Sequence, residues 1–171
     1  CGYNTMQQNE EAVFKAWGDV EANLQRRTDL IPNLVEVVKG FAAQEKETLT
    51  AVIEARAKAT AVNVSASDLG SAQAMQRLSG AQGELSSALS RLMVVVERYP
   101  DLKANQNMMQ LTEELTSTEN KIAFSRQGYN DQVLFYNNKI QMFPSNIIAG
   151  MFGFKEAEFF EVEDEAVREA P

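Results

Sequence analysis

Apolar side chains recur at steps of three and four residues along three stretches of the chain, which places them on one face of a helix. The first stretch spans residues 6–60. The second follows a polar connection in which Ser67 or Asp68 can cap a helix, and it ends at Pro100. The third ends at Pro144 and would be roughly 55–60 Å long at ~1.5 Å per residue. Because Gly and Pro are sparse inside these stretches, the pattern predicts an all-α fold, an elongated up-and-down bundle of long antiparallel helices.

The first stretch is nearly twice as long as the second, and it contains Pro32. In one interpretation the helix continues with a kink, because the apolar spacing persists across the proline. In the other the helix breaks: Arg26 and Arg27 favour a helix C-terminus, and Thr28 or Asp29 caps a new helix. The break would give four segments of comparable length. We favour the kink, since a hairpin at this point would need a tight turn without glycine.

A continuous first helix has a consequence for its N-terminal half. It could leave one apolar stripe without a partner inside the chain. We therefore predict this stripe as a surface for a neighbouring subunit or another protein; its residues are Val13, Trp17, Val20 and Leu24.

The C-terminal part is rich in phenylalanine and then in acidic residues. Five of the nine Phe lie from Phe143 onward. After Pro144 the pattern predicts a short helix, capped by Ser145 or Asn146 and ended by Gly153. Its aromatic residues either plug one end of the core or, as Phe152 and Phe154 would, form an exposed contact patch.

Residues 155–171 hold seven acidic and two basic side chains. The alternating part of this segment, AEFFEVE, could extend along the bundle. From about Asp164 onward we expect a solvated, disordered acidic tail.

The charge balance and the missing residue types exclude several functions. A net charge of −8 disfavours nucleic acid and anionic lipid headgroups as partners. The chain has no histidine, so the usual di-iron site of helical bundles cannot form and no imidazole can activate a Ser or Thr nucleophile. No phosphate-binding glycine loop is present. We expect no catalytic residues, no metal site and no cofactor.

Several polar residues lie at positions that would face neighbouring helices. Arginine offers a planar fork that suits a carboxylate, and buried polar groups of this kind must be paired. We predict a structural polar network that fixes the register of the helices, with a partner-binding groove as the alternative; its residues are Arg26, Arg27, Asp29, Glu119, Asn120, Arg126 and Asn130.

Long segments of the chain resemble the LemA family of bacterial envelope proteins. They are AWGDVEANLQRRTDLIPNLVEVVKGFA, ERYPDLKANQN, LTEELTSTENKIAFSRQGYND and YNNKIQMFPSNIIAGMFGF. The likeness begins at GYN and covers nearly the whole chain to FGF. It implies an α-helical (four-helix) bundle tethered to a membrane at its N-terminus, and a family with no established activity.

Cys1 stands where many members of that family leave the membrane. It is the single cysteine, so it cannot form an internal disulfide. We expect it to carry the lipid of a bacterial lipoprotein after cleavage of a signal peptide. Gly2 is not acidic, which favours the outer membrane or the periplasmic side. The predicted organisation is a lipid-anchored tether at 1–10, a bundle at 11–154 and an acidic tail at 155–171.

These features together predict a non-enzymatic, lipid-anchored scaffold or accessory subunit of an envelope complex. Its partners would be the membrane, through Cys1, and other envelope proteins or a second copy. The alternative is a ligand-binding or regulatory envelope protein with a pocket between helices.

Overall fold

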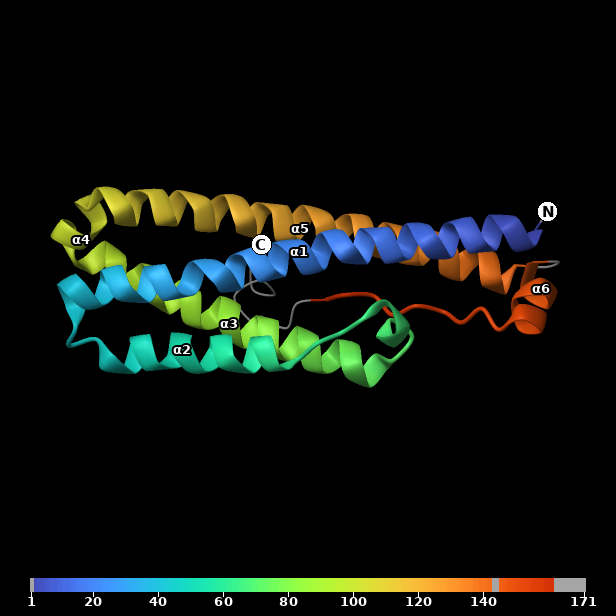
Figure 1. Cartoon of the computed structure of the whole chain (residues 1–171), viewed down its shortest axis with the longest axis horizontal. Helices are drawn as coiled ribbons and strands as arrows, with labels where there is room; N and C mark the ends of the chain where they lie inside the picture. The colour runs from blue at the N-terminus through green and yellow to red at the C-terminus, as the bar shows by residue number, and fades with distance from the viewer. Residues whose placement is uncertain (1, 143–144, 162–171) are drawn as a thin grey trace, which may run out of the picture.

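The computed structural model describes residues 2–142 and 145–161, and these residues form a long rod of helices without strands (Figure 1). Four long helices make an up-and-down bundle, as predicted. The elements are α1 Gly2–Ala42, α2 Lys46–Ala61, the 3-10 turn η1 Ala66–Asp68, α3 Ala72–Arg98, α4 Pro100–Ala104, α5 Gln106–Gln141 and α6 Ser145–Phe152.

Helix α1 passes through Pro32 without a break, so the broken alternative is wrong. Proline has no N–H, and the carbonyl of Thr28, one turn earlier, therefore lacks its helical donor. Arg56 of α2 supplies a substitute: its Nε donates to the Thr28 carbonyl oxygen at 3.1 Å. Ile31 and Leu34 are buried on either side of the proline, so packing holds both halves of the helix in line.

The chain reverses eleven residues after Pro32, in the turn at residues 43–45. The first predicted stretch therefore holds two helices, separated at a point with no proline and no side-chain cap. Glu45 begins α2 without a side-chain hydrogen bond to the helix. Tyr99 holds the turn from outside, because its hydroxyl lies 3.1 Å from Glu45 Oε1 and 2.7 Å from Gln44 Nε2.

The other helix ends follow ordinary capping chemistry. Ser71 caps α3, three residues beyond the predicted Asp68, since Ser65 and Asp68 instead cap each other around η1. Asn105 caps α5 by accepting from the Met108 N–H at 3.0 Å. Helix α6 ends as predicted at Gly153, whose φ of 72° allows the Phe154 N–H to reach the Ala149 carbonyl at 3.0 Å.

The helices differ in length, and this decides what covers α1. Helices α1 and α5 run antiparallel along almost the whole rod, whereas α2 and α3 cover only part of it (Figure 1). Over the remaining part, residues 62–71 and an extended segment after α6 take the place of α2. We call that segment, residues 154–161, the strap.

The interior consists of two apolar clusters with a polar layer between them. One cluster lies toward the N-terminus of α1 and includes Trp17 and Tyr129; the other lies toward its C-terminus and includes Leu34 and Leu92. The buried polar residues between the clusters are Arg27, Thr28, Ser79, Gln82 and Thr118.

The N-terminal part of the described chain is more ordered than predicted. Residues 2–10, expected as a tail before the first helix, are helical, and Met6 is buried. The Tyr3 ring packs on Phe152 and Phe154, with centroids 4.5 and 5.8 Å apart, which fastens this first turn to α6. The strap lies along the bundle, as the alternating pattern suggested. The expected disordered tail from Asp164 lies outside the described residues, as do Cys1 and Phe143.

Candidate functional site

The predicted partner stripe on α1 is not a free surface. Val13, Trp17, Val20 and Leu24 are all buried within the chain. The prediction failed because the partners of the stripe come from α5, from the segment before α3 and from the strap. None of these is visible in the heptad pattern of α1 itself.

Two asparagines of α5 hold the strap by its backbone. Asn130 donates to the Phe160 carbonyl at 2.9 Å and accepts from the Phe160 N–H at 2.7 Å. Asn137 makes the same pair of bonds with Ala157, both at 2.9 Å. Seven helical residues span about 10.5 Å and three extended residues about 10 Å, so the two spacings match.

The strap completes an aromatic cluster around Trp17. The indole lies against the rings of Tyr129 and Phe160, at centroid distances of 5.1 and 5.7 Å, and its Nε1–H donates to the Val64 carbonyl at 3.0 Å. The Tyr129 hydroxyl donates to the Glu158 carbonyl at 2.8 Å. Burial raises the Tyr129 pKa, so this hydroxyl stays a donor at any physiological pH.

Arg27 is the centre of the polar layer, and only 4% of it is exposed. Its two terminal nitrogens donate to Ser86 Oγ at 2.8 Å and to Gln82 Oε1 at 2.6 Å, both on α3. Nε has no hydrogen-bond partner among the described residues. The guanidinium thus joins α1 to α3 through neutral groups, with no carboxylate within ion-pair distance in the described part of the chain.

Glu119 of α5 carries the negative charge that acts on Arg27. Partial desolvation raises the pKa of Glu119, and the Arg27 charge opposes that shift. Burial lowers the pKa of Arg27, and Glu119 opposes this shift in turn. The two groups therefore interact through space across the layer.

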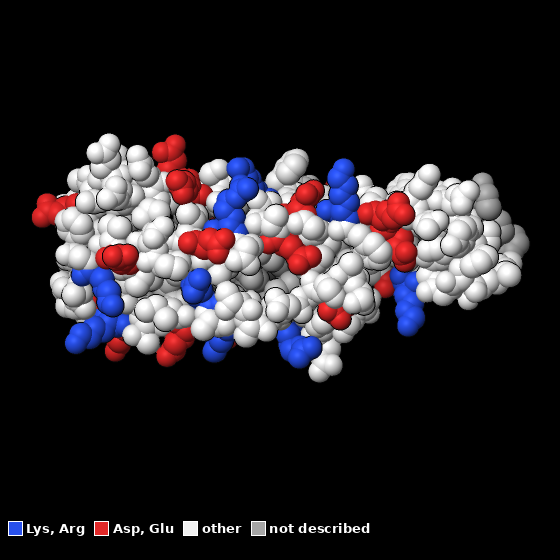
Figure 2. All heavy atoms as spheres, viewed as in Figure 1, with Lys and Arg blue, Asp and Glu red and all other residues white. Residues whose placement is uncertain are grey.

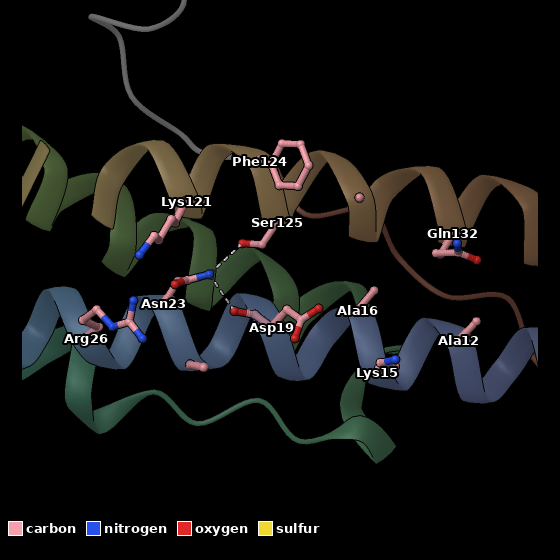
Figure 3. Close-up of a pocket in the computed structure, with 12 residues that line it drawn as sticks. Ala12, Lys15, Ala16, Asp19, Asn23, Arg26, Lys121, Phe124, Ser125 and Gln132 are labelled. Carbon is pink, nitrogen blue, oxygen red and sulfur yellow. Dashed lines mark hydrogen bonds between the residues drawn. The ribbon is translucent and has the colours of Figure 1, made fainter. Parts of the chain in front are cut away.

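A groove runs along the seam between α1 and α5 (Figure 3). Its first hollow has a volume of about 580 Å³ and a floor of small residues, among them Ala16 of α1 and Gly128 of α5. Asn23 crosses the seam and donates to Ser125 Oγ at 3.4 Å and to the Asp19 carbonyl at 3.0 Å. Because several side chains that line the seam are small, they leave its outer side hollow.

The same groove continues toward the far end of the rod. A second hollow of about 630 Å³ shares Arg26 and Lys121 with the first, and a third of about 420 Å³ shares Gln110 and Glu114 with the second. From Ala12 to Val37 the groove is about 37 Å long. Phe124 stands at its edge with 81% of its surface exposed. Such a long, shallow, mixed-charge surface fits an elongated polypeptide better than a small molecule.

The sequence profile described as LemA family matches residues 16–171. The chain belongs to the LemA family. This confirms the resemblance seen in its long central segments, and the family expectation of a helical bundle is confirmed by the structure.

Several curated relatives of this LemA-family chain are similar to it over most of its length. "Magnetosome protein MamQ 2" of Paramagnetospirillum magneticum is 30% identical over 178 residues, which cover 93% of this chain and 64% of the relative. "Magnetosome protein MamQ" of Magnetospirillum gryphiswaldense is 31% identical, covering 88% and 61%. "Protein LemA" of Metamycoplasma hominis is 25% identical, covering 85% and 63%. The chain thus spans less than two thirds of the length of each.

The structure separates the predicted polar network of this LemA-family chain into parts. Arg27 is buried in the polar layer, and Glu119 acts on it only through its charge. Asn130 is one of the two asparagines that hold the strap, and Arg26 lines the groove. Asp29 accepts from Gln25 on its own helix at 2.8 Å. Asn120 lines a hollow beside Phe124, and Arg126 is half-buried on α5.

Sequence reasoning missed the residues that complete these sites. Gln82 and Ser86 lie on α3, Arg56 on α2 and Asn137 on α5. One signal was available: Asn130 and Asn137 are one heptad apart, so they lie on the same face of a helix. The partners of Arg27 had no comparable signal, since Gln and Ser are ordinary surface residues of helices.

The two predicted contact residues of the C-terminal part differ in their surroundings. Phe152 is 58% exposed at the end of the rod, whereas Phe154 is half-buried against Tyr3. Among the helices of residues 2–142 and 145–161, none combines the length and hydropathy needed to cross a membrane.

Proposed function

We propose that this LemA-family chain is a non-enzymatic scaffold of the bacterial envelope, anchored to a membrane by a lipid on Cys1. The α1–α5 groove would be the surface that it presents to other envelope proteins. The observation that carries the proposal is the groove itself: an open channel about 37 Å long with an almost fully exposed Phe124 at its edge.

The geometry of the rod supports the division into an anchored end and a presenting surface. Gly2 lies at one tip, so a lipid on the preceding residue would leave the rod there (Figure 1). The middle of the first hollow, near Asp19, is about 25 Å from that tip along α1. Two or more acyl chains anchor a protein firmly, which suits the proposed tether.

The groove also favours a protein partner over a small ligand. A half-open hollow between α1 and α3, near Trp17 and Gln82, has a volume of only about 100 Å³. Exposed aromatic side chains are frequent anchors of protein interfaces, and Phe124 is flanked by charges of both signs that can set the orientation of a partner. We therefore place the ligand-pocket alternative behind the scaffold.

Photocrosslinking in native membranes tests the groove. A crosslinking amino acid at position 124 or 132 should give one dominant adduct, whereas the same group at Val94, exposed on α3, should not. The adduct should disappear when Asn23→Lys fills the seam. Equal adducts from all three positions, or recovery as a lone monomer in mild detergent, would contradict the scaffold.

Mass spectrometry of the N-terminal peptide tests the anchor separately. Protein isolated from native membranes should carry a diacylglyceryl group on Cys1, and Cys1→Ser should release it into the soluble fraction. An unmodified Cys1 in membrane-derived protein would refute the lipid anchor and leave the groove untouched.

A further inference from the structure

We propose that the tip of the rod formed by α6 and the first turn of α1 inserts into the interfacial region of a lipid bilayer. The proposal rests on the membrane attachment proposed above and adds a second, non-covalent contact. It concerns the chemistry of one short helix and its position.

Helix α6 is apolar nearly all round. Apart from Ser145 and Asn146 it consists of Ile, Ala, Gly, Met and Phe. Ala149 is buried against the bundle, yet three large side chains point to solvent: Ile147 is 54% exposed, Met151 74% and Phe152 58%. A helix with no polar face is normally buried in protein or in lipid, and here only its inner side meets protein.

The whole tip also lacks charge. No Asp, Glu, Lys or Arg occurs in residues 2–9 or between Lys139 and Lys155. Figure 2 shows this end of the rod without red or blue spheres, in contrast to the rest of the same face. Met142, at the end of α5, adds another exposed apolar side chain, 56% exposed.

The charged residues around the tip do not favour a partner with a strong charge of one sign. Lys139 and Lys155 stand there together with Glu10, Glu11 and Glu156, so the border carries charges of both signs. An acidic or basic peptide would find no complement on this surface. A bilayer interface suits it, because exposed aromatic and aliphatic side chains enter the headgroup boundary while long lysine side chains extend back toward water.

The position of α6 brings it to the membrane that holds the N-terminus. The Cα of Gly2 lies so close to α6 that an added Cβ would sit 2.7 Å from Ile148 Cδ1. Tyr3 is fastened to Phe152 by its ring. Whatever attaches the chain to a bilayer before Gly2 must therefore leave the rod beside the exposed face of α6.

Vesicle binding by the full chain with Cys1→Ser tests the inference, because that chain cannot carry the lipid. It should sediment with neutral phosphatidylcholine vesicles, and phosphatidylglycerol should change the binding little. Ile147→Asp with Met151→Asp should weaken partition by about tenfold or more, since two large apolar side chains leave the interface. The matched control is Ile53→Asp with Val94→Asp, two exposed apolar residues of α2 and α3, which should leave partition unchanged.

A fluorescent reporter checks the depth of insertion. In the Cys1→Ser chain, an environment-sensitive dye on Met151→Cys should shift to the blue with vesicles, and the same dye on Val94→Cys should not. No binding at saturating lipid, or equal losses in the tip and control variants, would overturn the inference. Tip-to-tip dimers without lipid, lost in the tip variant, would assign the surface to a second copy instead.

The outcomes also separate this inference from the proposed anchor. If native protein is lipidated but the Cys1→Ser chain does not bind vesicles, the tip inference is wrong and the lipid anchor is supported. If the Cys1→Ser chain binds vesicles while native Cys1 is unmodified, the anchor fails and the tip inference stands.

Discussion

Arg56 donates from Nε to the carbonyl oxygen of Thr28 at 3.1 Å, and that carbonyl is the acceptor which Pro32 leaves without its helical donor. The two residues belong to α2 and α1. A side chain from the neighbouring helix thus repairs the one backbone bond that proline removes, and α1 continues for ten residues beyond it.

This pairing predicts a coupling between Arg56 and Pro32. Arg56→Ala should lower the free energy of unfolding by about 1–2 kcal/mol, because a partly buried carbonyl loses its donor. In a Pro32→Ala background the backbone N–H returns, and the same change should cost at least about 0.5 kcal/mol less. Denaturant unfolding of the four proteins measures the coupling. Equal losses in both backgrounds would show that Arg56 does not replace the missing bond.

The hydrogen bonds between Asn130 and Phe160 of the strap predict a change in tryptophan fluorescence when they are removed. Asn130→Ala leaves the Phe160 N–H and carbonyl without partners, so it should destabilise the strap by about 1–3 kcal/mol. Because Phe160 covers Trp17, which is the single tryptophan, fluorescence emission should move toward the red.

Asn138→Ala is the control for Asn130→Ala, since Asn138 is exposed on the same helix. Its emission spectrum should match that of the wild type. A red shift of the same size in both variants would mean that the Trp17 environment responds to general loosening of α5 rather than to the strap.

The buried guanidinium predicts a difference between two substitutions of one residue. Arg27→Ala should lower the unfolding free energy by about 2–4 kcal/mol, because it opens a cavity and leaves Gln82 and Ser86 unpaired. Arg27→Met refills the space and removes a charge that lacks a close carboxylate, so we expect a loss of about 1 kcal/mol or less. Arg26→Ala, on the exposed side, should stay within about 0.5 kcal/mol of the wild type.

A large loss in Arg27→Met would contradict this account. It would show that the positive charge itself stabilises the layer, through Glu119 or another group, and that packing and hydrogen bonding do not suffice.

Glu119 predicts a pH dependence of stability. Burial raises its folded-state pKa above the ordinary value of 4.5, so the folded state binds the proton more tightly than the unfolded state. The contribution of Glu119 is then most favourable below the unfolded pKa and declines as pH rises through the folded pKa. Glu119→Gln removes the titration. The unfolding free energy of Glu119→Gln minus that of the wild type should increase with pH from about 4.5 and then level off. A difference that stays flat or falls with rising pH would refute the assignment.

The sequence alone predicted the helices well, because each is long and repeats its apolar spacing many times. Pro100 and Gly153, both predicted, mark real helix boundaries for ordinary chemical reasons. The turn at residues 43–45 escaped prediction because it has no proline, no cap and no glycine of its own, and it is held by Tyr99 from more than fifty residues away.

The sites were harder to predict than the fold, because they too depend on contacts between residues that are distant in the sequence. Trp17 was recognised as important but placed on an outer surface, since its partners Val64 and Phe160 lie far along the chain. Arg27 was predicted to pair with a carboxylate, whereas the structure pairs it with Gln82 and Ser86, which carry no pattern that marks them. Heptad spacing shows which face of a helix a side chain lies on, but it does not show which segment of the chain packs against that face.

The unbroken α1 also gives the rod a mechanical property. The helix begins at the tip beside α6, crosses the polar layer at Arg27 and ends at the turn held by Tyr99. Both apolar clusters pack on this one helix. Because α1 is one continuous helix, its two ends move together. A tilt of the rod where the chain meets a surface therefore displaces the opposite end, about 60 Å away.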